Sequence, residues 1–148
     1  MDNIFMKHAL KYIEEGFYVF PLKPKSKVPL TMNGFKDASN DPEQINRWWT
    51  EWPNANLGIA TGEISNLWVV DIDGELPDDL PKFHETRTVK TKKGYHLYYE
   101  YNKFFRLPSK TRLCGYPIDI RSDGAYIVAP PSIHPDRGAY EDVDFPFK

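Results

Sequence analysis

The chain has 148 residues, of which 41% are hydrophobic and 15% aromatic, and this indicates a globular protein with one core of domain size. It has no apolar run near the roughly 20 residues that a membrane span needs, and its first residues lack the pattern of a signal peptide. The single Cys114 excludes an internal disulfide and a zinc site built from cysteines. We therefore expect a cytoplasmic protein without zinc.

Charge is distributed unevenly along the chain. The net charge is −2, which argues against a protein that coats nucleic acid without specificity. Nine of the nineteen basic residues nevertheless lie between positions 82 and 112, with only Glu85 and Glu100 among them. This basic region is either a local surface for anions or a lysine-rich hairpin exposed to solvent.

The beginning of the chain predicts a helix, a strand and a loop. Apolar residues recur at helical spacing from position 4 to position 13, and Gly16 is a stop signal. Residues 17–22 have the composition of a strand. The segment 23–36 contains the proline, glycine and serine typical of a loop.

A second helix is predicted from position 42. Asp41 is its expected N-cap, Pro42 occupies the first helical position, and Gln44 would close a capping box. Trp48 and Trp49 lie on its apolar side. Core packing is the favoured role for this pair, and stacking on a nucleic-acid base is the alternative.

The remainder of the chain is predicted to form strands separated by turns at Gly62, Gly74, Gly94 and Gly124. The expected strands are 57–60, 67–72, 86–91, 95–101, 117–121 and 125–128. The final segment, 141–148, is predicted to be irregular. Early helices followed by a largely antiparallel sheet indicate an α+β fold.

The strand predicted at 67–72 leads into two acids, Asp71 and Asp73. Their spacing alone carries no weight, because Asp142 and Asp144 repeat it in the polar tail. Residues i and i+2 of a strand point to the same face, so the two side chains would project together from a buried run. Partly desolvated carboxylates repel each other, and a divalent cation such as Mg²⁺ or Mn²⁺ would remove that cost. The structural alternative is an Asp-rich turn that caps the strand.

Two further polar motifs follow. His96 comes after Lys92, Lys93 and Gly94, and the glycine allows close backbone approach. A histidine behind two lysines is a candidate phosphate contact, and an exposed histidine on a hairpin is the alternative.

The third carboxylate lies in the strand predicted at 117–121. Ile118 and Ile120 would face the core, whereas Asp119 and Arg121 would share the opposite face. The structural alternative for these two is a salt bridge between neighbours.

The order of these motifs resembles that of a known family. An acid pair that ends a strand is followed by Gly-x-His, by a hydrophobic-Asp-hydrophobic-Arg strand and by the Ala-Pro-Pro-Ser turn at 129–132. Further matching pieces are VFPL at 19–22, KVP at 27–29, GFKDA at 34–38, the Trp48-Trp49 pair and NLGIATG at 56–62. Over residues 16–140 the chain resembles the bifunctional DNA primase/polymerase (Prim-Pol) domain. This domain belongs to the archaeo-eukaryotic primase superfamily and occurs in replication proteins of plasmids, phages and integrated elements.

The resemblance implies an archaeo-eukaryotic primase-like catalytic core. In it, an N-terminal α/β module packs against an RRM-like β-rich module, with the site in the cleft between them. The implied activity is template-directed nucleotidyl transfer by a two-metal mechanism, with Mg²⁺ or Mn²⁺ as the ions. Asp71, Asp73 and Asp119 match the family's metal-binding carboxylates. Together with His96 they are the expected catalytic residues.

The resemblance also implies the substrate contacts. The nucleotide, a dNTP or an NTP, would bind through its triphosphate to His96, Lys92, Arg121 and Ser132. A DNA template and primer would contact the basic region. The expected DNA-binding residues are Lys90, Lys93, Lys103 and Arg106.

The sequence departs from the family's pattern before the histidine. Relatives often have two glycines there, and many superfamily members have a serine two residues before the histidine; this chain has Lys93 and Gly94, so one phosphate contact would be missing. The single cysteine leaves no zinc-binding insertion. The 148 residues themselves contain no helicase or helix-bundle priming region. We therefore expect one primase/polymerase domain over residues 1–148, either minimal or a fragment of a larger replication protein, with a helicase region or replication protein as its partner in cis or in trans.

Two other functions remain open on the sequence alone. The run VVDIDG at 69–74 also resembles the nucleophile motif of haloacid-dehalogenase-like phosphatases, although that motif is normally followed by a threonine and a long helix. The other alternative is a non-catalytic nucleic-acid or nucleotide-binding module that uses the aromatic residues of 95–101 as a stacking platform. Metal dependence distinguishes such a binding module from the enzyme.

Overall fold

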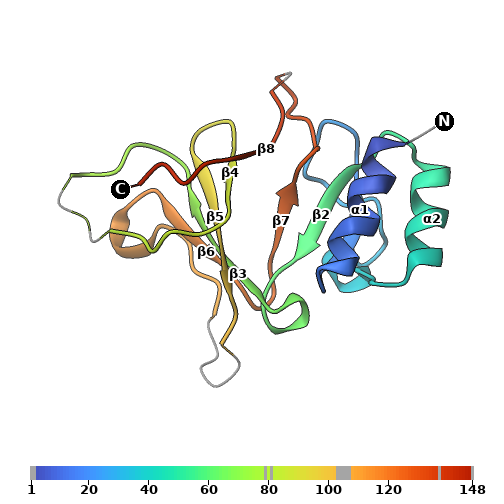
Figure 1. Ribbon diagram of the computed structural model, residues 1–148, viewed down its shortest axis with the longest axis horizontal. Coiled ribbons are helices and arrows are strands. Elements are labelled where there is room, and N and C mark those ends of the chain that lie inside the picture. The colour runs from blue at the N-terminus through green and yellow to red at the C-terminus, as the bar shows by residue number, and fades with distance from the viewer. Residues whose placement is uncertain (1–2, 79, 81, 103–107, 137, 148) are drawn as a thin grey trace.

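The computed structural model describes residues 3–78, 80, 82–102, 108–136 and 138–147. Within these residues, two α-helices and two antiparallel sheets form the fold, which confirms the α+β class (Figure 1). The helices are α1 (Ile4–Glu14) and α2 (Pro42–Glu51). The strands are β1 (Tyr18–Leu22), β2 (Asn56–Ala60), β3 (Leu67–Ile72), β4 (Thr88–Lys90), β5 (Tyr95–Glu100), β6 (Ile118–Arg121), β7 (Tyr126–Ala129) and β8 (Glu141–Val143).

The first sheet has the strand order β1-β2-β7, and both helices pack against it on the side away from the second sheet (Figure 1). The chain leaves α1 through Gly16, whose φ of +96° is the left-handed conformation expected of a residue that follows a helix. Pro21 lies in β1, at the edge of this sheet, where a missing backbone N–H breaks no ladder bond. Neither described helix is long and apolar enough to cross a membrane.

The predicted start of α2 is confirmed in one part and wrong in another. The Asp41 side chain caps the helix by accepting the N–H of Glu43 at 3.0 Å. Gln44 does not close a capping box, because its side chain accepts from Arg47 at 3.0 Å and the N–H of Asp41 donates to the hydroxyl of Ser39 instead.

The tryptophan pair lies on the apolar side of α2, as predicted. Trp49 is buried and donates its indole N–H to the carbonyl of Ala55 at 3.0 Å. Trp48 is half-buried and packs against the same core. Core packing is therefore confirmed for this pair.

The second sheet has the strand order β6-β3-β5-β4-β8. Strand β3 has the predicted bounds, whereas the strand expected at 86–91 is only three residues long as β4. The tail predicted to be irregular contributes β8, which pairs with β4 through Asp142 opposite Val89. Its exposed polar residues give no strand pattern, and it forms because β4 offers an otherwise unpaired edge.

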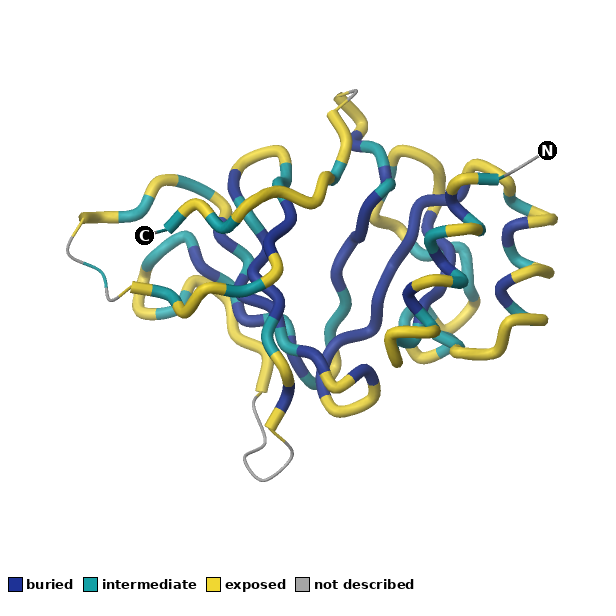
Figure 2. The backbone as a smooth tube through the Cα atoms, viewed as in Figure 1, coloured by how far each residue is buried: buried dark blue, intermediate teal, exposed yellow. Residues whose placement is uncertain are grey.

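Strand β3 contributes to two different cores. Leu67 and Val69 face the first sheet and join the core cluster that also holds Trp49. Val70 and Ile72 face the other way, into a second cluster. Figure 2 shows that β1, β2, β3 and β7 are buried along most of their length, whereas β8 and many of the connecting loops are exposed.

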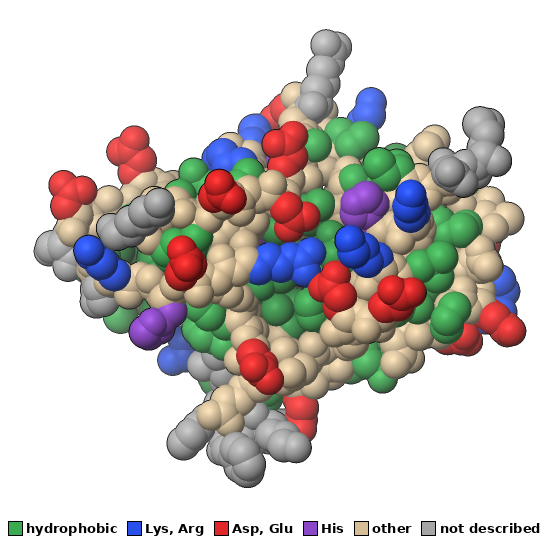
Figure 3. All heavy atoms as spheres, in the orientation of Figure 1, with side chains coloured by type: hydrophobic (Ala, Val, Ile, Leu, Met, Phe, Trp, Pro, Cys, Tyr) green, Lys and Arg blue, Asp and Glu red, His purple; other side chains and the backbone are tan. Residues whose placement is uncertain are grey.

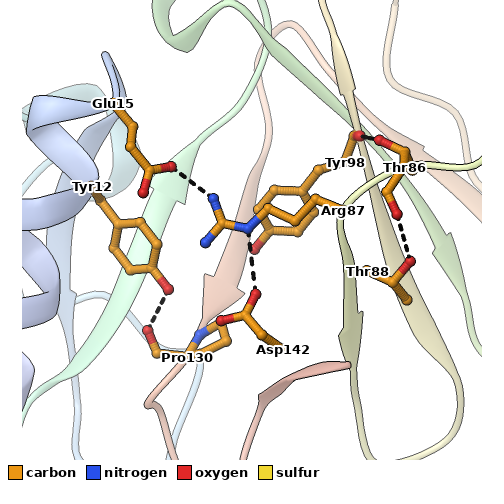
Figure 4. A network of polar contacts seen from close by, with 8 residues as sticks. All are labelled: Tyr12, Glu15, Thr86, Arg87, Thr88, Tyr98, Pro130 and Asp142. Atoms are coloured by element: carbon orange, nitrogen blue, oxygen red, sulfur yellow. Dashed lines mark hydrogen bonds and ion pairs between the residues drawn. The ribbon is translucent and has the colours of Figure 1, made fainter. Parts of the chain in front are cut away.

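An arginine joins the end of α1 to the edge of the second sheet (Figure 4). The guanidinium of Arg87 contacts the carboxylate of Glu15 at 2.7 Å and that of Asp142 at 3.3 Å. It also lies over the rings of Tyr12, at 5.7 Å, and Tyr98, at 5.3 Å. Burial acts to lower the pKa of Arg87, whereas the charge of Glu15, followed by those of other groups that include Asp142, acts to raise it. The charges prevail, so the pKa is raised. This contact set is the polar link between the helical layer and the second sheet.

Replacing Arg87 with leucine should lower the free energy of unfolding by about 1–2 kcal/mol, since it removes two partly exposed ion pairs and two cation–π contacts. Urea denaturation measures the change, and added salt should reduce it. Arg47→Leu is the matched control, because Arg47 is an exposed arginine of α2 whose guanidinium donates to the neighbouring Gln44 of the same helix. Equal losses in the two variants would contradict a linking role for Arg87.

Candidate active site

Strand β3 carries Asp71 between two other polar residues of the site. In the antiparallel ladders, Asp71 lies directly opposite His96 of β5 and directly opposite Asp119 of β6. Directly opposite residues share a face of the sheet, with Cβ atoms about 5 Å apart. The three side chains therefore form a row across adjacent strands, on the face that also carries Val69.

Asp71 lies between two basic side chains. Its Oδ1 lies 3.4 Å from Nε2 of His96, and its Oδ2 lies 3.6 Å from Nη2 of Arg121. Burial acts to raise the pKa of Asp71, but the hydrogen bond and charge of His96, followed by those of Arg121, outweigh it and lower that pKa. The carboxyl group is consequently ionised at neutral pH, in spite of being only 19% exposed.

Asp119 shares the same arginine. Nη2 of Arg121 lies 2.9 Å from Oδ2 of Asp119, while Oδ1 accepts the backbone N–H of Arg112 at 2.8 Å. The salt bridge considered as a structural alternative is thus present. It is part of a larger arrangement, because the same guanidinium nitrogen contacts Asp71 as well.

Asp73 follows the end of β3 and is exposed. Its backbone N–H donates to the carbonyl of Pro117 at 2.9 Å, which holds the end of β3 beside the start of β6. On the other side, a Cβ at Gly94 would lie 1.8 Å from the carbonyl oxygen of Ile72. The close approach expected at Gly94 is confirmed, and it packs the turn that carries Lys92 against the end of β3.

A cleft of about 850 Å³ lies between the two sheets, and its floor is formed by Asp71, Asp73, His96, Asp119 and Arg121. Its opposite wall is β7, and its rim consists of segments 26–28, 91–93 and 133–136. Lys92 forms an ion pair with Asp136 across part of this rim. Figure 3 shows one face of the molecule, and basic and acidic side chains lie side by side across its middle.

The carboxylates are chemically suited to bind a hard divalent cation. Asp71 and Asp119 offer oxygen ligands, which Mg²⁺ and Mn²⁺ prefer, and both contact one guanidinium cation. In the part of the chain that the structure describes, no three His, Cys, Asp or Glu side chains are gathered closely enough to enclose an ion. The metal-binding role of Asp71, Asp73 and Asp119 stays a prediction.

The other predicted substrate contacts divide into three groups. Lys92, Lys93, His96 and Arg121 all line the cleft. Lys90 does not: it lies over the ring of Tyr95 and lines a separate pocket. Lys103 and Arg106 lie outside the described residues.

Ser132 requires a correction as a nucleotide contact. Its side chain is fully buried, and its hydroxyl accepts the N–H of Leu57 at 2.8 Å. It therefore fastens the turn after β7 to the start of β2 and does not line the cleft. The turn that contains Ser132 could be predicted from the sequence. The backbone N–H of Leu57 in β2, which donates to its hydroxyl, could not.

The sequence interpretation missed Tyr140 and His134. Their rings stack with centroids 4.1 Å apart, and Tyr140 also lies 6.1 Å from His96. Burial, followed by the charges of Asp71 and Asp73, raises the pKa of Tyr140 to about 12, so its phenol remains a hydrogen-bond donor beside the acids. Neither residue belongs to a periodic segment, and only the neighbouring Pro-Pro-Ser turn pointed to this region.

Asn56 was also missed, and it positions two loops of the rim. Its amide nitrogen donates to the carbonyls of Ser26, at 3.0 Å, and Ile133, at 2.9 Å. Its oxygen accepts the N–H of Ile133 at 3.0 Å. Since Ser26 and Ile133 both line the cleft, this one buried amide fixes two loops of its rim relative to each other.

The haloacid-dehalogenase-like alternative finds no support in the geometry. Asp71 lies in a wholly antiparallel sheet, and among the described residues after Gly74 the next regular element is the strand β4. The long helix that would follow the nucleophile motif is not among the elements described there.

His134 should make stability depend on pH. Burial, followed by the charges of Lys92 and His96, lowers its pKa from 6.5, so below about that pH the unfolded chain binds a proton that the folded chain resists. The free energy of unfolding should therefore fall as the pH drops below 6.5. His134→Asn should show a smaller fall between neutral and mildly acidic pH in urea titrations. The exposed His84 provides the control His84→Asn, which should retain the full fall; an unchanged pH profile for His134→Asn would contradict the assignment.

Comparison with known proteins identifies a family for this chain. A search of curated proteins found no relative of this chain. Among protein families, the one described as "Bifunctional DNA primase/polymerase, N-terminal" (Prim-Pol) matches residues 9–146. This family implies a function of the DNA primase/polymerase type, with DNA and nucleotides as substrates. Because the match covers nearly the whole chain, it confirms the resemblance seen in the motifs, and the protein belongs to the Prim-Pol family.

Proposed function

We propose that the protein joins nucleotides on a DNA template by a two-metal mechanism. The observation that carries this proposal is the row of His96, Asp71 and Asp119 on three adjacent strands. The row faces a cleft of about 850 Å³, which is large enough for a nucleotide. Family membership supplies the reaction type, and the row supplies the place for it.

Asp71, Asp73 and Asp119 would hold two Mg²⁺ or Mn²⁺ ions. When bound, such ions activate a primer hydroxyl and neutralise charge on the triphosphate. The chain prepares the ligands for this role. The lowered pKa keeps Asp71 ionised, and the N–H of Arg112 fixes one oxygen of Asp119 at 2.8 Å.

Positive side chains around the acids would bind the triphosphate. His96 and Arg121 lie on the floor beside Asp71, and Lys92 lies on the rim above them. Charge-assisted hydrogen bonds from such groups orient phosphate oxygens, and positioning of this kind supplies most of the catalysis in phosphoryl transfer.

We further propose the setting of this reaction. The second sheet would act as the RRM-like module of a primase-like core, and the described chain as a single catalytic domain. Lys93 lies at the cleft and Lys90 on a neighbouring pocket, so DNA would follow the turn between β4 and β5. The context would be cytoplasmic replication of a plasmid, phage or integrated element, with a helicase region or replication protein as partner.

Removing either central carboxylate should abolish nucleotide incorporation. Asp71→Asn and Asp119→Asn keep the size of the side chain but remove its charge, and each should lower incorporation at least about a hundredfold. The assay uses a primed template, dNTPs and Mn²⁺, with an unprimed template in parallel. Asp144→Asn is the matched control, since Asp144 belongs to the second Asp-x-Asp of the chain and is exposed. If both cleft variants extended primers as well as the wild type does, the assignment of Asp71 and Asp119 to the active site would be wrong.

His96→Asn should separate nucleotide binding from DNA binding. A lost charge-assisted contact should weaken dNTP binding by about tenfold or more, whereas DNA affinity should stay within about twofold. Titrations of both ligands, followed by fluorescence anisotropy, measure the difference, and His84→Asn serves as the control. Equal losses for dNTP and DNA would show that His96 does not contact the triphosphate.

A further inference from the structure

Arg121 occupies the point at which the two carboxylates meet. One nitrogen, Nη2, contacts Oδ2 of Asp71 at 3.6 Å and Oδ2 of Asp119 at 2.9 Å. The second oxygen of each acid has another partner, His96 for Asp71 and the N–H of Arg112 for Asp119. The guanidinium therefore holds the two oxygens that remain for a further cation.

A divalent ion and this guanidinium would compete for the negative charge of those oxygens. Mg²⁺ binds carboxylate oxygen at about 2.1 Å, so an ion on Asp119 would lie within about 5 Å of Nη2 if the arginine stayed in place. Two cations so close repel strongly in a partly buried site. The side chain of Arg121 is 35% exposed and lines the cleft, so it has room to turn away from the floor.

We propose that Arg121 exchanges between two partners. Without a metal ion it bridges Asp71 and Asp119; when the carboxylates take up Mg²⁺ or Mn²⁺, it turns into the cleft and becomes available to the triphosphate. This inference rests on the proposed function and assigns Arg121 a coupling role in it. The arginine neutralises the acids before the ion arrives and then contributes its charge to the substrate.

The exchange of Arg121 between two partners would couple metal binding to nucleotide binding, whereas an arginine that stayed in place would not. The ion must displace a bound cation, so Arg121 weakens metal binding in the absence of nucleotide. A triphosphate that binds the displaced guanidinium favours the metal-bound arrangement. By linkage, metal and nucleotide then strengthen each other's binding by the same factor.

Metal affinity tests the exchange directly. Mn²⁺ is titrated into the protein without nucleotide or DNA, and free Mn²⁺ is followed by electron paramagnetic resonance. Arg121→Gln, which removes the competing charge, should bind Mn²⁺ at least about fivefold more tightly than wild type. Arg121→Lys keeps the charge and should stay within about twofold of wild type. Unchanged or weaker Mn²⁺ binding by Arg121→Gln would overturn the proposal.

Arg112→Gln is the matched control for that titration. Arg112 contacts the same carboxylate only through its backbone N–H, while its side chain donates to the carbonyl of Gly115 at 3.1 Å. Its replacement should leave Mn²⁺ affinity unchanged. Thermal melting without metal establishes that each variant is folded.

The movement itself has a spectroscopic signature. Mg²⁺ added to the ¹⁵N-labelled wild-type protein should shift the Nε–H resonance of Arg121, which is identified by its absence from Arg121→Gln. A resonance that does not move while Mg²⁺ binds would overturn the exchange. Primer extension is measured on the same samples: extension without any effect of Arg121 on metal affinity refutes the exchange alone, and metal binding without extension refutes the proposed function alone.

Discussion

The site depends on the pairing register of β3 between β5 and β6. That register places Asp71 opposite both His96 and Asp119, so three residues distant in sequence meet without any loop to position them. A slip by one residue would turn Asp71 into the apolar cluster of Ile118 and Ile120 and bring Val70 into the cleft. The hydrophobic pattern that stabilises the sheet therefore also fixes the geometry of the acids.

The face of β3 that points to the first sheet is apolar at its beginning and polar at its end, because the cleft separates the two sheets there. Leu67 and Val69 are buried between the sheets, whereas Asp71, two residues further, lies on the floor of the cleft. Two sets of contacts flank this region: Arg87 links α1 to the edge of the second sheet, and Asn56 of β2 fixes the rim loops that follow β1 and β7. The cleft can stay open because the core and these contacts carry the stability.

Local sequence rules predicted the elements but not the long-range partners. The apolar run predicted the bounds of β3, and alternation predicted the faces of His96 and Asp119. Gly94 was expected to allow a close backbone approach, and a Cβ there would collide with the backbone of Ile72. Strand β8 was missed because an unpaired edge creates it and its own residues do not. Ser132 was assigned to the cleft because its turn was visible in sequence, whereas the β2 backbone that binds its hydroxyl was not. Tyr140 could be found only once the fold had brought it to the acids.

For Asp119 and Arg121, the structural and the functional interpretation are not exclusive. Two carboxylates on adjacent strands must be neutralised for the protein to fold, and Arg121 does this at 2.9 and 3.6 Å. A permanent salt bridge would bury the site's charge in a contact with no further use. The side chain of Arg121 is 35% exposed, and a partly exposed salt bridge contributes little stability. A divalent cation can therefore displace it. Like charges can therefore lie at the edge of a core: Arg121 neutralises them in the folded chain, and in the proposed exchange metal ions would take over that role.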